Sequence, residues 1–400
     1  MTITEHPVFV VMVVAAAAPL LAELPKRLRV PVVVLEVLLG VVVGPHGLGW
    51  LEPGHFMDKM SQIGMATLLF MAGMELDFSR IRGRPLGLAL GGWGLSLVIG
   101  LLVVAVLHVL PGVDAPMMVT LALATTGLGV LLPVLRDSGQ LDTAYGRLLL
   151  AAGTVGELGP IVLVSLLLSQ RYGSAQEFGL LLVFLLLMAG AAAVGMGVRP
   201  PRVLALLSRT LHASTQLPVR LVLVIVAAAA VISETMGFER ILGAFAAGMI
   251  VGLTIRGEGG EPLRVKLDAV CFGLLVPFFF VGTGMAFDLP ALMHDARSML
   301  LPPALMLLML LVRGLPVVLY RRELEPAQRL PFALSSSVSS LGLVVVIAEI
   351  GVRAQAMGAE VSRSLVAAAL LSTLVFPTVS SLAAPRAPSL HKLRDDLGDQ

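Results

Sequence analysis

Long apolar segments, separated by short polar or Pro/Gly-rich connections, run through almost the whole chain. A helix needs about 20 mostly apolar residues to cross a bilayer, and most of these segments approach that length. The composition agrees, because 57% of the residues are hydrophobic, 14% are charged and the mean hydropathy is +0.94, whereas soluble domains are about a quarter charged. The sequence therefore predicts an all-α polytopic membrane protein and excludes a soluble globular fold.

Polar residues, prolines and glycines divide the chain into about thirteen predicted transmembrane helices. We place them near residues 6–24, 30–44, 60–76, 85–111, 115–136, 143–169, 177–198, 216–237, 239–255, 268–287, 298–320, 327–351 and 361–383. Together they form one transmembrane domain over residues 1–383. The polar segment 384–400 is expected to be a short cytoplasmic tail without fixed structure.

The lysines and arginines are distributed unevenly between the two sides of these helices. If the N-terminus is outside, twenty-one of the 28 lie in connections on the inside, six lie in connections on the outside, and Arg313 lies within a span. Positive residues accumulate on the cytoplasmic side of membrane proteins. The distribution predicts an outside N-terminus and a cytoplasmic C-terminus.

The sixth predicted span carries an ionisable side chain, Glu157, close to its middle. A carboxylate at this depth is costly, and in membrane proteins it usually marks an ion path or a proton relay. Gly153, Gly156 and Gly159 surround it, and Pro160, which has no N–H, leaves a carbonyl one turn earlier free. These features favour a cation or proton site at Glu157. The alternative is a structural glutamate bonded to a neighbouring helix.

Two predicted spans are interrupted near their centres by hydroxyl-bearing residues and glycine. The fifth contains the run TTGLG at 125–129, and the twelfth contains the run SSSVSSLG at 335–342. The residues expected to support the two breaks are Thr125, Thr126, Gly127, Gly129, Ser336, Ser337 and Ser339. The two spans run in opposite directions in corresponding halves of the chain, a pattern typical of inverted repeats with two crossing discontinuous helices. Alternatively, each is a continuous kinked helix whose Ser and Thr side chains bond its own carbonyls.

Arg313 is, after Glu157, the second unusual charged residue inside a predicted span. Arginine stays charged in proteins, so it needs an internal partner, water or carbonyl groups. We expect it to face the protein interior and to balance Glu157 or the carbonyl ends of the broken helices. Alternatively, it extends toward the inner interface, where Arg321 and Arg322 lie.

The sequence predicts no enzyme, cofactor or nucleic-acid function. The single cysteine, Cys271, excludes an intramolecular disulfide and a cysteine-based metal cluster, and the seven histidines show no ligand spacing. The only metal expected is a transported Na⁺ or K⁺ at Glu157, and the expected surroundings are the lipid bilayer.

Five segments of the chain carry motifs of one transporter family. They are LRVPVVVLEVLLGVVVGPHGLG, IGMATLLFMAGMELDF, TTGLGVLLPVLRDSGQLDTAYGRLLLAAG, SETMGFERILGAFAAGMIVG and PFFFVGTGMAFDL. With these segments, the membrane part resembles the bacterial monovalent cation/proton antiporters of the Kef-like and sodium/proton exchanger branch. The resemblance implies the Na⁺/H⁺ antiporter fold, with a core bundle, a scaffold bundle that forms a homodimer, and a place in the bacterial inner membrane.

The resemblance also assigns roles to individual residues. Glu157 falls on the second position of the family's two-acid motif and Gly156 on the first, while Arg313 falls on the basic position that pairs with this motif. In the twelfth span, Ser340-Leu341-Gly342 stands where the family often has Arg-Gly-Glu. The chain therefore keeps one titrating carboxylate where many relatives have two.

From these observations we expect a secondary antiporter that contributes to pH homeostasis by exchanging Na⁺ or K⁺ for H⁺. Glu157, Thr125 and Thr126 would bind the cation, Arg313 would supply a fixed positive charge, and the exchange would be electroneutral and 1:1. Two alternatives are a gated K⁺ efflux protein that conducts passively and a sensor that does not transport.

Overall fold

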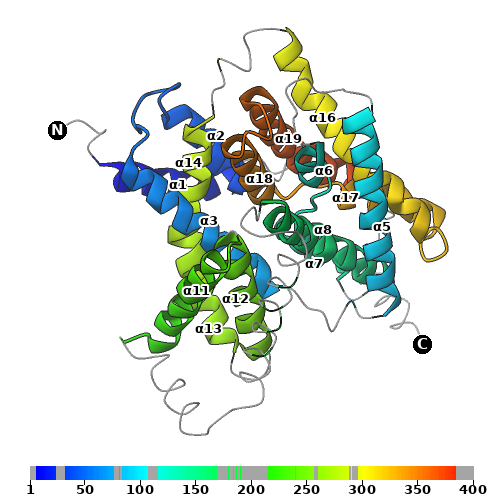
Figure 1. Ribbon diagram of the computed structural model, residues 1–400, viewed down its shortest axis with the longest axis horizontal. Coiled ribbons are helices and arrows are strands. Elements are labelled where there is room, and N and C mark those ends of the chain that lie inside the picture. Colours follow the sequence, from blue (N-terminus) through cyan, green and yellow to red (C-terminus); the bar gives the residue numbers. More distant parts are fainter. Residues whose placement is uncertain are drawn as a thin grey trace, which may run out of the picture.

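The computed structural model describes residues 6–23, 32–75, 81, 83–106, 116–141, 143–168, 215–238, 240–255, 260–287 and 296–383, together with the isolated positions 179, 183, 186, 190 and 290. Within these residues the regular structure is entirely helical. Figure 1 shows that the helices lie in two neighbouring groups.

The first group contains helices from the N-terminal third and from the middle of the chain. It comprises α1 (Pro7–Glu23), α2 (Val32–Val43), α3 (His55–Glu75), α11 (Leu217–Thr235), α12 (Arg240–Ile255), α13 (Glu261–Val270), a π-helical turn (Cys271–Leu275) and α14 (Val276–Met285). Helix α3 packs on both α12 and α14, and α2 packs on α14 and α1 (Figure 1). These contacts bury most residues of α12 and α14.

The second group contains the two broken helices. It comprises α5 (Arg84–Leu101) with a π-helical turn (Leu102–Val106), α6 (Pro116–Leu123), α7 (Leu128–Asp137), α8 (Ala144–Leu168), α16 (Ala296–Gly314) with a 3₁₀ turn (Leu315–Tyr320), α17 (Pro326–Ser336), α18 (Leu341–Arg353) and α19 (Ala359–Ala383). Helix α5 packs along α8, and α19 packs on α16, α17 and α18. The broken helices therefore lie between continuous ones.

Twelve of the thirteen predicted spans coincide with these helices, and the remaining one, 177–198, falls almost entirely outside the described residues. By length and composition, six described helices could cross a membrane, and the bent pair α17–α18 makes a seventh; α1, α2 and α12 are shorter apolar helices. Two predicted edges are wrong, because α3 begins at His55 and α13 at Glu261. Charged residues marked those edges in the sequence, but helices continue into the polar interface.

Glycines allow helices of the first group to touch backbone to backbone. A Cβ atom at Gly248 of α12 would overlap the carbonyl oxygen of Phe70 in α3, and one at Gly40 of α2 would lie 2.5 Å from the carbonyl oxygen of Val281 in α14. Because lipid supplies no hydrophobic driving force between helices, close packing of small residues stabilises such contacts. These glycines fix the spacing of the first group.

The substitution Gly248→Ala should therefore lower the thermal unfolding midpoint in detergent, because α12 must move away from α3. Overpacking of this kind costs about 1–3 kcal/mol. The matched control is Gly87→Ala in α5, where a Cβ atom would meet nothing within 4 Å. Equal midpoints for the two variants would show that the α3–α12 contact does not limit stability.

Candidate ion-binding site

Both predicted breaks are present, and each is shorter than the run of residues that predicted it. The first covers residues 124–127 between α6 and α7, and the second covers residues 337–340 between α17 and α18, which are bent by 45°. Gly129 therefore lies inside α7, and Ser336 is the last residue of α17. The predictions extended the breaks too far, because α7 already begins at Leu128 and α17 continues through Ser335 and Ser336.

The two breaks cross in direct contact. The N–H of Gly127 donates to the carbonyl of Val338 at 2.8 Å, and the hydroxyls of Thr125 and Ser339 lie 2.9 Å apart. A Cβ atom at position 127 would lie 2.8 Å from the carbonyl oxygen of Ser339, so only glycine allows this approach. The predicted crossing of two discontinuous helices is confirmed.

Hydroxyl groups bond to the backbone beside the second break. Ser337 donates its side-chain O–H to the carbonyl of Ala333 at 2.7 Å, and Ser336 lies 3.1 Å from the same carbonyl and 3.2 Å from the carbonyl of Arg313. Ser372 of α19 accepts the N–H of Ser339 at 3.2 Å. Such local bonds offer the backbone an alternative to the helix, so the serines end α17 as the sequence suggested.

Helix α8 is tied to the first break through a carbonyl that Pro160 leaves free. Pro160 has no N–H for the carbonyl of Gly156, four residues earlier. That carbonyl accepts the N–H of Thr126 at 3.1 Å. The proline therefore places the acidic helix against the unwound segment.

Glu157 lies buried where two helices begin. Its side chain is 6% exposed, Ser340 donates to its Oε1 at 3.4 Å, and the backbone N–H of Leu128 lies near the carboxylate. Leu128 is the first residue of α7, and Ser340 precedes the first residue of α18. Helix N-termini carry partial positive charge, so both half-helices stabilise a carboxylate here. The Oε2 atom has no hydrogen-bond partner among the described residues.

Arg313 faces the interior from the last turn of α16 and is 4% exposed. Its Nε donates to the hydroxyl of Thr126 at 2.8 Å, and one terminal nitrogen donates to the carbonyl of Ala152 at 3.1 Å. The other lies 3.4 Å from the hydroxyl of Ser96. Thr126 in turn donates to the carbonyl of Ser336 at 2.7 Å, at the C-terminus of α17. The guanidinium therefore has neutral oxygen partners, and no ion pair joins it to Glu157 within the described part of the chain.

Gly156 separates the two charged groups, and it has no room for a side chain. A Cβ atom there would lie 2.6 Å from the Thr126 hydroxyl and 2.9 Å from a terminal nitrogen of Arg313. The space that an acid at this position would need is occupied by Thr126 and the guanidinium. The site therefore holds one carboxylate in this arrangement.

Three residues near the site were not predicted from the sequence. Trp93 and Ser96 of α5 contact the first break and Arg313, respectively. Glu75, at the end of α3, is partly exposed and interacts electrostatically with Glu157. Its place within the AGMELD motif was the one sequence signal that could have indicated this.

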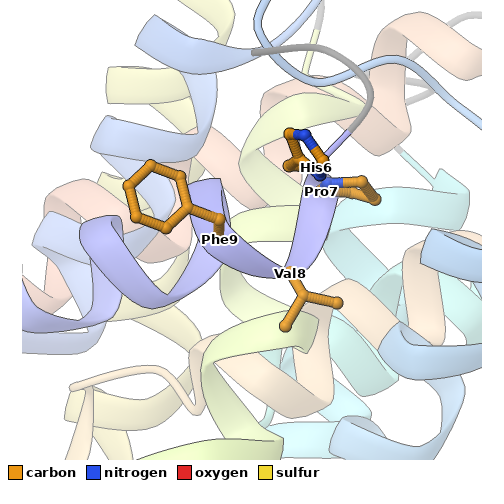
Figure 2. A pocket seen from close by; sticks show the side chains of 4 residues that line it. All are labelled: His6, Pro7, Val8 and Phe9. Carbon is orange, nitrogen blue, oxygen red and sulfur yellow. The ribbon is translucent and has the colours of Figure 1, made fainter. Parts of the chain in front are cut away.

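No other arrangement of the described residues resembles a binding centre. Within the described ranges, no three His, Cys, Asp or Glu side chains are grouped to hold a metal ion. A pocket at the start of α1 is lined by His6, Pro7, Val8 and Phe9 (Figure 2), and these four consecutive residues share no helix with Glu157 or Arg313. The breaks around Glu157 are the candidate site.

Comparisons with known proteins agree with this fold. A family model described as sodium/hydrogen exchanger, transmembrane, matches residues 12–383. The chain is 26% identical to the putative Na⁺/H⁺ antiporter YjbQ of Bacillus subtilis, over 92% of this chain and 61% of that protein. It is 28% identical to the Na⁺/H⁺-K⁺ antiporter GerN of Bacillus cereus, over 69% of this chain and 70% of that protein. The chain thus spans about three-fifths of the length of the Bacillus subtilis relative.

A solved structure shows the same fold. The sodium proton antiporter MjNhaP1 from Methanocaldococcus jannaschii at pH 8 superposes with a TM-score of 0.60 at 17% sequence identity, and the match covers 96% of this chain and 95% of that chain. The predicted all-α antiporter fold is confirmed.

The geometry predicts energetic coupling between Thr126 and Arg313. Thr126→Val removes a hydroxyl that both accepts from Arg313 and donates to α17, and Arg313→Met removes the guanidinium. Each single change removes the same bond between the Thr126 hydroxyl and the Arg313 guanidinium, so the double variant loses that bond only once. The two losses of stability should therefore fall short of additive by about 1–3 kcal/mol. Thermal unfolding of both single variants and the double variant in detergent measures this difference.

The matched control for that cycle is Thr283→Val in α14, where the hydroxyl donates within its own helix to the carbonyl of Phe279 at 2.8 Å. Its loss should add to that of Arg313→Met. Additive losses for Thr126→Val as well would contradict the described contact.

Proposed function

The chain belongs to the sodium/hydrogen exchanger family, and we propose on this basis that it is a secondary antiporter that exchanges Na⁺ or K⁺ for H⁺. The named relatives support this, since they are antiporters of Na⁺ and, for the Bacillus cereus protein, also of K⁺. The proposed setting is the bacterial inner membrane, with the N-terminus outside and the C-terminus in the cytoplasm, as the distribution of Lys and Arg favours.

The single observation that carries the proposal is the buried, unpartnered Oε2 atom of Glu157. A buried polar atom without a partner is costly, and a proton or a cation bound at that oxygen would remove the cost. The backbone carbonyls of Thr125 and Thr126 also accept no hydrogen bond from a described residue. Carboxylate and carbonyl oxygens suit hard cations, so these residues form the proposed shared site.

Arg313 accounts for the proposed stoichiometry. With a proton bound, Glu157 is neutral and the site carries the single charge of Arg313. With Na⁺ or K⁺ bound, the carboxylate and the cation cancel, and the same single charge remains. Because Gly156 provides no second acid, each cation exchanges for one proton and the cycle moves no net charge.

The two groups of helices provide the proposed movement. The site belongs to the group of α5–α8 and α16–α19, which meets the other group where α8 packs on α12 and where α18 approaches α3 and α14. A Cβ atom at Gly342 of α18 would lie 2.4 Å from the nearest side-chain carbon of Leu68 in α3 and 3.7 Å from a ring carbon of Phe279 in α14. These contacts are apolar, which favours sliding of the site-bearing bundle along them to expose Glu157 to each side. The other group is the proposed scaffold and homodimer interface.

Glu157→Gln tests the role of the carboxylate. Glutamine keeps the shape but cannot ionise, so cation-dependent proton flux in proteoliposomes should fall at least about 100-fold, to background, while the unfolding midpoint changes little. The matched control is Glu349→Gln, which removes an exposed ion pair with Arg353 near the end of α18 and should leave flux unchanged. Normal flux in Glu157→Gln would refute the assignment and favour a structural glutamate.

Imposed voltage tests the stoichiometry. Moving one elementary charge across 100 mV is worth about 2.3 kcal/mol, so an exchanger that moves net charge responds strongly to membrane potential. We expect the equilibrium cation ratio across proteoliposomes to be the same at 0 and −100 mV. A clear voltage dependence would require a second titrating group, with the buried Glu36 of α2 and the partly exposed Glu75 of α3 the first to substitute. Passive flux without an opposing gradient would instead indicate a channel.

A further inference from the structure

Trp93 of α5 connects the two parts of the site that carry the proposed ligands. Its indole N–H donates to the carbonyl of Ala124 at 3.2 Å, at the first residue of the break. The six-membered edge of its ring lies against α8 at Gly159, where a Cβ atom would come within 2.5 Å of the ring. Gly159 is two residues beyond Glu157. One side chain therefore contacts both the unwound segment and the acidic helix.

The hydrogen bond from Trp93 makes the carbonyl of Ala124 different from the other carbonyls of the break. The carbonyls of Thr125 and Thr126 have no described donor, whereas the carbonyl of Ala124 is occupied by Trp93. The same bond fixes the plane of the Ala124–Thr125 peptide. Thr125 is then held with its hydroxyl 2.9 Å from the carbonyl of Ala122 and 2.9 Å from the hydroxyl of Ser339.

The ring contact makes the position of Trp93 depend on Gly159. Any side chain at 159 would push the indole away from α8, and the N–H would lose its direction toward Ala124. Three residues further along α5, Ser96 contacts Arg313. This face of α5 therefore supports the unwound segment and the fixed charge, without supplying a ligand itself.

We propose that Trp93 is a positioning residue that sets cation preference by keeping the Ala124 carbonyl out of the cation's coordination shell. The inference rests on the proposed exchange at Glu157. With the indole in place, the break offers few oxygens in a fixed arrangement, which suits the smaller Na⁺. Without the N–H, an additional free carbonyl and a looser peptide suit the larger K⁺, because selectivity follows cavity size, ligand number and flexibility.

Trp93→Phe is the direct test, since phenylalanine keeps an aromatic ring near Gly159 and removes the N–H. A hydrogen bond contributes about 1 kcal/mol, so the ratio of apparent KM values, K⁺ over Na⁺, should fall about five-fold. The maximal rate with saturating cation and the apparent KM for protons should stay within two-fold. The control is Trp50→Phe, because Trp50, the only other tryptophan, lies in the connection after α2 and is 39% exposed.

Gly159→Ala should weaken the same bond between Trp93 and Ala124 by displacing the indole ring. It serves as a second, independent variant in case Trp93→Phe impairs folding. It should shift the K⁺-over-Na⁺ ratio in the same direction as Trp93→Phe, and combining the two should add little. An unchanged ratio in Trp93→Phe, or a loss of maximal rate at an unchanged ratio, overturns the inference and leaves a structural role. Absence of exchange in the wild-type protein would overturn the proposed function itself, and this inference with it.

Discussion

The structure depends on the burial of a carboxylate and a guanidinium among apolar helices without an ion pair between them. A charge at this depth costs several kcal/mol or more unless the protein replaces its hydration. The broken helices meet this need: the N-termini of α7 and α18 face Glu157, and Arg313 lies beside oxygens near the C-termini of α6 and α17. Continuous helices would offer no such ends at mid-depth, which explains why both breaks occur at this level.

Small residues make that arrangement possible. Gly127 lets one break touch the other, and Gly156 lets Thr126 and Arg313 approach α8. Pro160 contributes in a different way, because its missing N–H frees the carbonyl that binds Thr126. The glycines and the proline act on the backbone, and the charged residues occupy the positions that the backbone creates.

Much of this architecture could be predicted from the sequence, because bilayer thickness and lipid impose strong patterns. The spans, the two interrupted helices and the isolated Glu157 and Arg313 are all visible as departures from continuous apolar runs. The partners of Arg313 could not be predicted, since any nearby oxygen can accept from a guanidinium and the nearest ones belong to Thr126, Ala152 and Ser96. Trp93 was also missed, because its contacts with Ala124 and Gly159 depend on how α5 packs across two other helices.

The bonds between the breaks and α8 have a consequence for the proposed exchange. Thr126, Gly127 and the carbonyl of Gly156 tie three helices together with hydrogen bonds that lie inside one bundle. A bundle of this kind presents the same oxygens in the same arrangement to whichever side of the membrane it opens toward. In the proposed exchange, the cation therefore meets the same ligands from either side, and the gradients of the two ions set the direction.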